Sequence, residues 1–454
     1  MRRLPAAIFV LIACTAPAEA HSAARGFVLL LPTGYVILGG ALVVLLSFAV
    51  VAALKRPVLP PGVPFDDPQT RRTHIPSLIT AALLLALLWV GFAGPHDPAE
   101  NLLPLSVWTL WWVVLVLLHP LFGNFWATLN PFSGPAALLQ RAIGKSPSPR
   151  LPQRLAYWPA FIIFTAFAWF QLVDPAPQDP ERLAVVVAIY ASATLAMTWL
   201  FSPGQWLGGA DPFAIFLRQL GAAAPRAGGR WRWPGVGLLD LETLPLAGFL
   251  FVLLTLASIS FDGFANTFLW LSWVGVNPLD YPGRTALMTA NTLGLAASFV
   301  VLTFVYVSCV CLGWLWAARP VELPLLLGRL VLSLIPISIA YHFAHYLGDT
   351  LLNLQYASLA LNDPLGSGAN LLGLAQLHVT ASFQNTASGA VALFTAQTVA
   401  IVFGHVVAVA VAHAMTAELG LARGRAVKLE TPLAALMIAY TAFGLWLLAT
   451  PAIG

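Results

Sequence analysis

Three ionisable side chains near the end of one apolar segment are the residues of this sequence best suited to chemistry. His342, His345 and Asp349 follow one another at intervals of three and four residues, so a helix would place them on a single face. Ionisable residues within membrane helices usually face the bundle interior or a wet cavity. The pattern suits a divalent metal ion such as zinc or copper, and a proton relay is an alternative. The structural alternative is a hydrogen-bond network between helices.

Other histidines could extend this candidate metal site. His405 lies in the next apolar segment and could supply a further ligand, although a lone buried histidine is more often hydrogen-bonded than ligating. His21 would be the first residue after cleavage of the leader, and its free amine and ring nitrogen could together chelate copper. Weaker candidates on the same predicted outer side are Asp262, Asn266 and His378, and His413 is a further weak candidate closer to the cytoplasm.

The composition places these residues in a membrane. The chain has 454 residues, of which 59% are hydrophobic and only 9% are charged, whereas soluble domains carry about 25% charged residues. The apolar runs are long and do not alternate with polar residues, which excludes a membrane β-barrel. The sequence therefore predicts an all-α, polytopic bundle. Its net charge of +4 is spread over short loops and does not indicate nucleic-acid binding.

The first twenty residues have the pattern of a secretory signal peptide. Arg2 and Arg3 precede a short apolar stretch, and Ala18-Glu19-Ala20 is a typical cleavage sequence. Cleavage there gives a signal peptide over 1–20 and a single transmembrane domain over 21–454. An alternative is processing at Cys14, because Leu11-Ile12-Ala13-Cys14 resembles a lipoprotein signal.

The distribution of cationic residues predicts the orientation of about ten spans. Secretion of the amino terminus places both mature ends in the periplasm of a bacterial inner membrane. Seventeen Lys and Arg residues then lie in cytoplasmic loops and three, Arg25, Arg182 and Arg284, on the periplasmic side, as the positive-inside rule requires. The predicted spans are 28–54, 76–93, 103–121, 156–172, 183–201, 244–261, 286–317, 323–348, 390–416 and 431–450.

Two cytoplasmic segments echo each other about 80 residues apart. Trp126 and Asn130-Pro131-Phe132 in the first correspond to Trp206 and Asp211-Pro212-Phe213 in the second. Asn or Asp before Pro is typical of a helix start, with the side chain as the cap. Each segment is predicted to form a short amphipathic helix on the inner membrane surface, and chance similarity is the alternative to duplication.

Several local motifs give the chain a family resemblance. They are Ala20-His21-Ser22, Gly123-Asn124 with Trp126, Asn130-Pro131, Asp211-Pro212-Phe213, Phe261-Asp262-Gly263-Phe264, Ala340 to Tyr346 and Gly404-His405-Val406. Together they resemble the bacterial multi-span membrane proteins known as fenitrothion hydrolases, over most of the chain. The resemblance implies hydrolysis of an organophosphorus triester. It supplies no catalytic motif that can be carried over residue by residue.

Three functions are therefore open at this point. The first is a membrane-embedded phosphotriester hydrolase, in which a metal held by His342, His345 and Asp349 would activate water. The second is a proton- or metal-coupled transporter or channel, and the third is a copper or haem redox protein. The expected partners are the lipid bilayer, an apolar small-molecule substrate and a possible second membrane subunit, with no nucleic acid. The sequence contains no nucleotide-binding loop, serine-hydrolase elbow or His-Glu-x-x-His motif.

Overall fold

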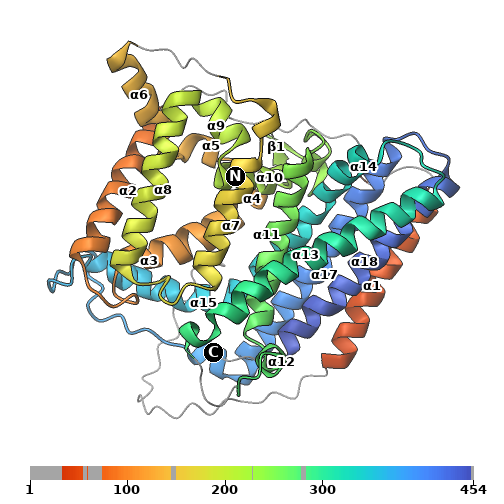
Figure 1. The fold of residues 1–454 in the computed structure, drawn as a ribbon. Coiled ribbons are helices and arrows are strands. Elements are labelled where there is room, and N and C mark those ends of the chain that lie inside the picture. The colour runs from red at the N-terminus through yellow and green to blue at the C-terminus, as the bar shows by residue number, and fades with distance from the viewer. Residues whose placement is uncertain are drawn as a thin grey trace, which may run out of the picture.

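The computed structural model describes residues 33–54, 59, 74–144, 150–227, 229–277 and 283–450 (Figure 1). The predicted signal peptide, the alternative Cys14 site and the candidate ligand His21 lie outside these residues. The bundle is almost entirely helical. The single sheet among the described residues pairs two short strands, β1 (Arg226–Ala227) and β2 (Arg230–Trp231).

Ten helical segments are long and apolar enough to cross a membrane, which confirms the predicted all-α polytopic fold. Their lengths suit a hydrocarbon layer about 30 Å thick. The simple ones are α1 (Thr33–Ala53), α2 (Ile75–Ala93), α7 (Trp158–Leu172), α8 (Pro180–Phe201), α11 (Leu246–Ala265), α13 (Arg284–Trp316), α17 (Ala387–Ala417) and α18 (Arg423–Ala449). The two compound spans are α3 (Leu102–Pro104) with η3 (Leu105–Leu115) and α4 (Val116–Phe122), and α14 (Leu323–Leu330) with η7 (Val331–Leu334) and α15 (Ile335–Asn362).

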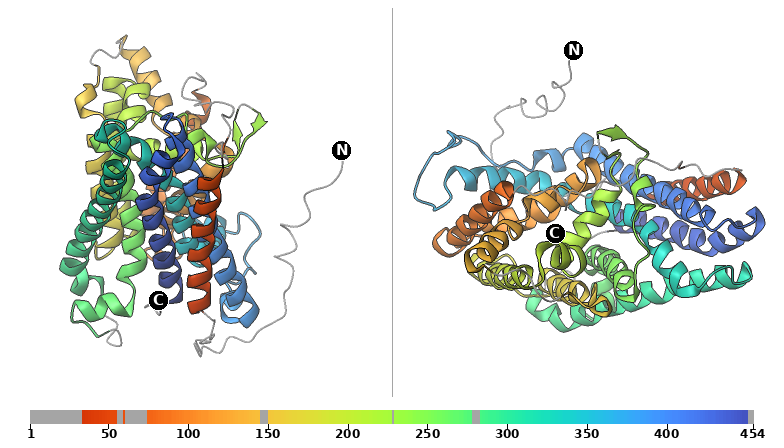
Figure 2. Two further views of the ribbon diagram at one scale, coloured as in Figure 1. Left: turned by 90° about the vertical axis from the view of Figure 1, so that its right-hand side faces the viewer. Right: turned by 90° about the horizontal axis from the view of Figure 1, so that it is seen from above.

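The short elements gather at the two ends of the bundle. One end carries α5 (Trp126–Leu129), α6 (Ser133–Ile143), α9 (Pro203–Gly209), α10 (Pro212–Ala222) and the β1–β2 hairpin, and the opposite end carries α3 and α12 (Phe268–Trp273) (Figures 1 and 2). The remaining short elements are η4 (Gln153–Leu155), η5 (Val236–Leu238) and α16 (Ser382–Asn385). The α12 end is the one predicted to face the periplasm, and that assignment stays a prediction.

Two spans form the interior of the bundle. The apolar windows of α11 and of the α14–α15 span are 72% and 67% buried, whereas those of α1 and α2 are only 17% buried. A membrane helix that is enclosed by neighbouring helices can carry polar side chains without exposing them to lipid. Polar residues on α11 and α15 are therefore held within protein.

The eighth span extends beyond its predicted end. The prediction stopped at residue 348, but α15 continues to Asn362. Side chains at the end of α15 accept hydrogen bonds from the segment that follows. Asn362 Oδ1 accepts the backbone N–H of Leu372 at 2.8 Å. The carboxylate of Asp363 accepts the backbone N–H groups of Ser367 and Gly368. The turn sequence from Asn362 to Gly368 thus terminates the helix, and Asp349 lies in its middle rather than at its end.

The structure corrects one part of the predicted repeat. Asp211 caps its helix as expected, because its Oδ1 accepts the N–H of Ala214 at 2.8 Å. However, α10 does not lie on the membrane surface, since nearly all of its residues are buried. Its apolar side chains Phe213 and Phe216 pack against the ring of Trp112 instead. An apolar helix gains more from burial against other helices than from an interfacial position.

The third span contains an unusual helical form. Over the eleven residues Leu105–Leu115 its backbone is π-helical. π-Helices are rare, usually a single turn long, and often occur at functional sites. This segment packs against α15 and carries three tryptophans, Trp108, Trp111 and Trp112.

Candidate active site

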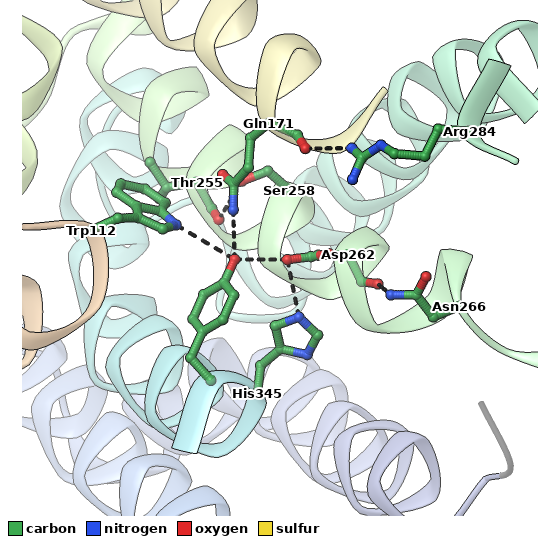
Figure 3. A network of polar contacts seen from close by, with 9 residues as sticks. Trp112, Gln171, Thr255, Ser258, Asp262, Asn266, Arg284 and His345 are labelled. Atoms are coloured by element: carbon green, nitrogen blue, oxygen red, sulfur yellow. Dashed lines mark hydrogen bonds and ion pairs between the residues drawn. The ribbon is translucent and has the colours of Figure 1, made fainter. Parts of the chain in front are cut away.

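A half-buried carboxylate and an imidazole meet where α11 and α15 approach each other. Asp262 lies in the last turn of α11 and His345 lies in α15. His345 Nε2 is 3.0 Å from Asp262 Oδ2 (Figure 3). An ionised carboxylate only accepts hydrogen bonds, so Nε2 carries the proton and Nδ1 keeps its lone pair. The pair is an Asp–His dyad of the kind that orients an imidazole as a base.

Tyr346 fixes the carboxylate from the other side. Its hydroxyl donates to Asp262 Oδ2 at 2.7 Å and accepts Gln171 Nε2–H at 2.7 Å, while Trp112 Nε1 lies 3.4 Å away (Figure 3). Oδ2 of Asp262 therefore receives bonds from two consecutive residues of α15. These contacts hold the carboxylate in a single orientation, which a catalytic or proton-carrying group requires.

The dyad opens on a polar cavity of about 360 Å³. Asp349 lines the same cavity, together with the single cation Arg284. Five carboxamide side chains also line it: Gln171, Gln178, Asn266, Asn291 and Asn353. This volume falls within the range of small-molecule sites, and such sites contain a few convergent polar groups. The cavity can therefore hold both a ligand and water beside the imidazole.

Arg284 is held in place by the end of α7. Its Nε donates to the carbonyl of Asp174 at 2.9 Å and its Nη2 to that of Gln171 at 2.6 Å. The last carbonyls of a helix have no partners within the helix, so a guanidinium is a favourable cap there. Figure 3 shows the contact of Arg284 with Gln171, which fixes the positive charge among the residues that line the cavity.

The predicted residues divide between two spaces. His345 and Asp349 line the large cavity, as their spacing suggested. His342 instead lines a small void of about 10 Å³ deeper in the bundle, which is close to the space of one water molecule. Its Nε2 lies 2.7 Å from the carbonyl oxygen of Trp112. Since a carbonyl can only accept, this nitrogen is a donor and cannot ligate a metal while the bond persists.

The proposed metal ligands that the structure describes do not gather into one group, and His21 lies outside the described residues. Among the described ranges of the chain, no three His, Cys, Asp or Glu side chains lie together as a possible metal-ligand group. His342 and His345 each use a ring nitrogen in a protein contact. His405 Nδ1 is 2.8 Å from the carbonyl of Ile401, and its buried Nε2 has no partner among the described residues. His413 pairs with Glu430 at 2.9 Å. We therefore derive no step through a metal ion.

Sequence reasoning underrated or missed the residues that complete the site. Asp262 was a minor candidate, although it is an acid within an apolar segment and such residues are costly in lipid. The sequence places Tyr346 only beside the face that carries His345 and Trp112 only in an aromatic belt, and Gln171 gives no signal. Arg284 was counted only as a topology signal. Their roles come from contacts between five different spans.

An aromatic layer closes the deep end of the cavity. The ring of Trp112 lies 4.7 Å from that of Phe167 and 5.9 Å from that of Phe216, measured between centroids. Phe164 and Phe213 belong to the same cluster. Bulky side chains thus separate the polar cavity from the other half of the bundle.

Comparison with protein-family models, with curated proteins and with solved structures gave no match for this chain.

Proposed function

We propose that the protein is a membrane-embedded hydrolase of apolar esters, organophosphorus triesters among them, in which the Asp262–His345 dyad activates water. The observation that carries this proposal is a half-buried, oriented Asp–His pair on the wall of a 360 Å³ cavity. The family resemblance of the sequence supports the same reaction. The proposal uses no metal, because the ligand geometry does not favour one.

The proposed reaction needs one water molecule. His345 Nδ1 takes a proton from this water as the new P–O bond forms, and the bond to the aryloxide leaving group breaks. Asp262 stabilises the resulting imidazolium, as the carboxylate does in hydrolytic triads. The imidazolium then returns its proton to solvent. Arg284 is the cation available to stabilise the negative charge that develops on the phosphoryl oxygen.

The setting suits an apolar substrate. Such a molecule concentrates in the bilayer and can reach the cavity from the membrane. We further propose that the chain lies in a bacterial inner membrane with the cavity open to the periplasm. The cationic loops predicted at the opposite end support this orientation.

The test is hydrolysis by the purified full chain in proteoliposomes, measured as nitrophenol released from fenitrothion. We expect Asp262→Asn and His345→Gln each to lower kcat by about 10²- to 10⁴-fold, the usual contribution of a general base. Asp363→Asn is the matched control, because this carboxylate lies in an exposed turn after α15. Wild-type rates in both site variants, with normal folding, would exclude the dyad as the base.

A second function, proton transfer, is favoured by the polar side chains that line the small void together with Asp262. Thr255 and Ser258 lie on the same face of α11 as Asp262 (Figure 3), and they line the small void with Ser338 and His342. The hydroxyl of Ser338 is buried and has no partner within the described part of the chain. A relay through these groups would give a proton flux across proteoliposomes that Asp262→Asn abolishes. Flux without any hydrolysis would favour this function over the first.

A further inference from the structure

A second cavity lies on the other side of the π-helical segment. Its volume is about 240 Å³, and it is enclosed by α2, η3, α7 and α8. Its lining is almost wholly apolar and aromatic, with Leu87, Phe167, Phe170, Val187 and Ala191 among the residues that form it. No charged side chain lines it, in contrast to the polar cavity.

The segment Leu105–Leu115 is the wall between the two cavities. Val107 and Trp111 line the apolar cavity, while Thr109 and Val113 line the polar one. Trp108 is the one residue that lines both. Its ring stacks on Phe167 and Phe170, and its Nε1 donates to the carbonyl of Pro177 at 3.0 Å. The side chain of Trp108 therefore borders both spaces.

The apolar cavity also borders the lipid. Leu83 of α2 and Val186 of α8 line it, and both are exposed on the outer surface of the bundle, at 58% and 36%. In a membrane these surfaces contact acyl chains. A hydrocarbon group can therefore leave the bilayer between α2 and α8 without crossing water, and the transfer involves no desolvation of polar groups.

From this arrangement we propose that the site takes an amphipathic ester, whose reacting head lies in the polar cavity and whose apolar part lies in the 240 Å³ cavity, with Trp108 as the specificity-determining residue between them. The ester group of the ligand is the part of this inference that rests on the proposed function. The two-compartment binding mode stands on the cavities alone. An apolar tail is matched by the aromatic lining, and a phosphoryl oxygen by the donors of the polar cavity.

The experiment uses a ligand that cannot be hydrolysed. The probe is a dimethyl alkyl phosphine oxide, which keeps the P=O head but has only P–C bonds, with an octyl or a butyl chain and a diazirine at the chain end. The full-length protein in nanodiscs is photolabelled and the labelled peptides are mapped. We expect the octyl probe to label residues of α2, η3 and α8 that line the apolar cavity.

Two variants fill the apolar cavity and one serves as the control. Ala191→Trp and the smaller change Val187→Phe place bulk into it, while Ile189→Trp adds the same ring to the lipid-facing side of α8. We expect at least a fivefold loss of octyl labelling in the first two and less than a twofold change in the third. Trp108→Ala should increase labelling by the octyl probe relative to the butyl probe.

The outcomes separate this inference from the proposed reaction. Octyl label found only on lipid-facing residues, or unchanged by both cavity-filling variants, would overturn the two-compartment site. Cavity labelling in a protein that hydrolyses no ester would support the binding mode and leave the hydrolase proposal refuted.

Discussion

At the scale of single residues, the site depends on one carboxylate that has two partners. Oδ2 of Asp262 contacts both His345 and Tyr346. A hydrogen bond to a charged group contributes about 1.5–3 kcal/mol. The phenol therefore has a measurable role in keeping the dyad oriented, although it takes no part in the proposed chemistry.

The variant Tyr346→Phe tests that role. Loss of the hydroxyl removes one bond to Asp262 and leaves Gln171 Nε2 without its acceptor. We expect kcat for ester hydrolysis to fall about tenfold to hundredfold, in line with the energy of such a bond, with a much smaller change in KM. The control is Tyr356→Phe on the same helix, whose ring packs in a separate apolar cluster. A wild-type kcat for Tyr346→Phe would show that the phenol does not position the base.

A second residue-scale prediction concerns the cap of α10, outside the membrane-spanning segments. Burial raises the pKa of Asp211 to about 6, although its bond from Tyr190 and those from backbone N–H groups of α10 oppose this rise. The folded pKa lies above the unfolded one, so the folded state binds more protons between about pH 4 and 6 and stability falls as pH rises through that window.

We expect Asp211→Asn, which keeps a capping oxygen, to flatten this part of the dependence of Tm on pH. The measurement is thermal unfolding of the detergent-solubilised chain at several pH values between 4 and 7. The same slope in the variant and the wild type would assign the pH dependence to another group.

At the scale of the elements, close packing of α15 on α17 holds the site-bearing helix in position. A Cβ atom added at Gly404 of α17 would lie 2.5 Å from Cβ of Ala340 and 2.7 Å from the carbonyl oxygen of Pro336. Small residues at such contacts let membrane helices approach each other closely. Both neighbours are rigid, so the backbones would have to separate to admit a side chain.

Gly404→Ala should therefore destabilise the bundle by about 1–3 kcal/mol, as overpacking does in other cores. The control is Gly39→Ala in α1, where an added Cβ meets no atom within 4 Å and the helix propensity of Ala should leave Tm unchanged or slightly higher. Thermal unfolding in one detergent measures both variants. An equal Tm for the two variants would show that α15 and α17 can part without cost.

At the scale of the whole molecule, the alternation of ten spans places the polar cavity and the cationic loops at opposite ends. The turn after α15 lies beside Gly94 and Pro95, which precede α3, and the β1–β2 hairpin lies at the end of the bundle opposite α3 (Figure 1). The proposed orientation therefore makes a prediction about access from each side of the membrane.

Single cysteines introduced as Ser367→Cys and Arg230→Cys should react with a membrane-impermeant maleimide from opposite sides. Both positions are exposed. In intact spheroplasts we expect labelling at position 367 only, and labelling at position 230 only after lysis. Two native cysteines of the described chain, Cys309 and Cys311, lie within α13. Labelling of the unsubstituted protein gives the background signal. The reverse pattern would invert the topology and place the cavity on the cytoplasmic side.

The sequence by itself determined the spans, because hydropathy and helix length are local properties that the bilayer selects directly. It also marked His345 as a candidate, since ionisable residues inside apolar segments are few. Only the tertiary structure decided that His345 pairs with Asp262 of α11. Asp349, which lies on the same helix as His345, lines the cavity as a further residue. That choice depends on how α11, α15 and the π-helical segment pack, and contacts between distant helices leave no periodic pattern in the sequence. The turn of His342 towards the Trp112 carbonyl, and the extension of α15 to Asn362, were decided by such contacts as well.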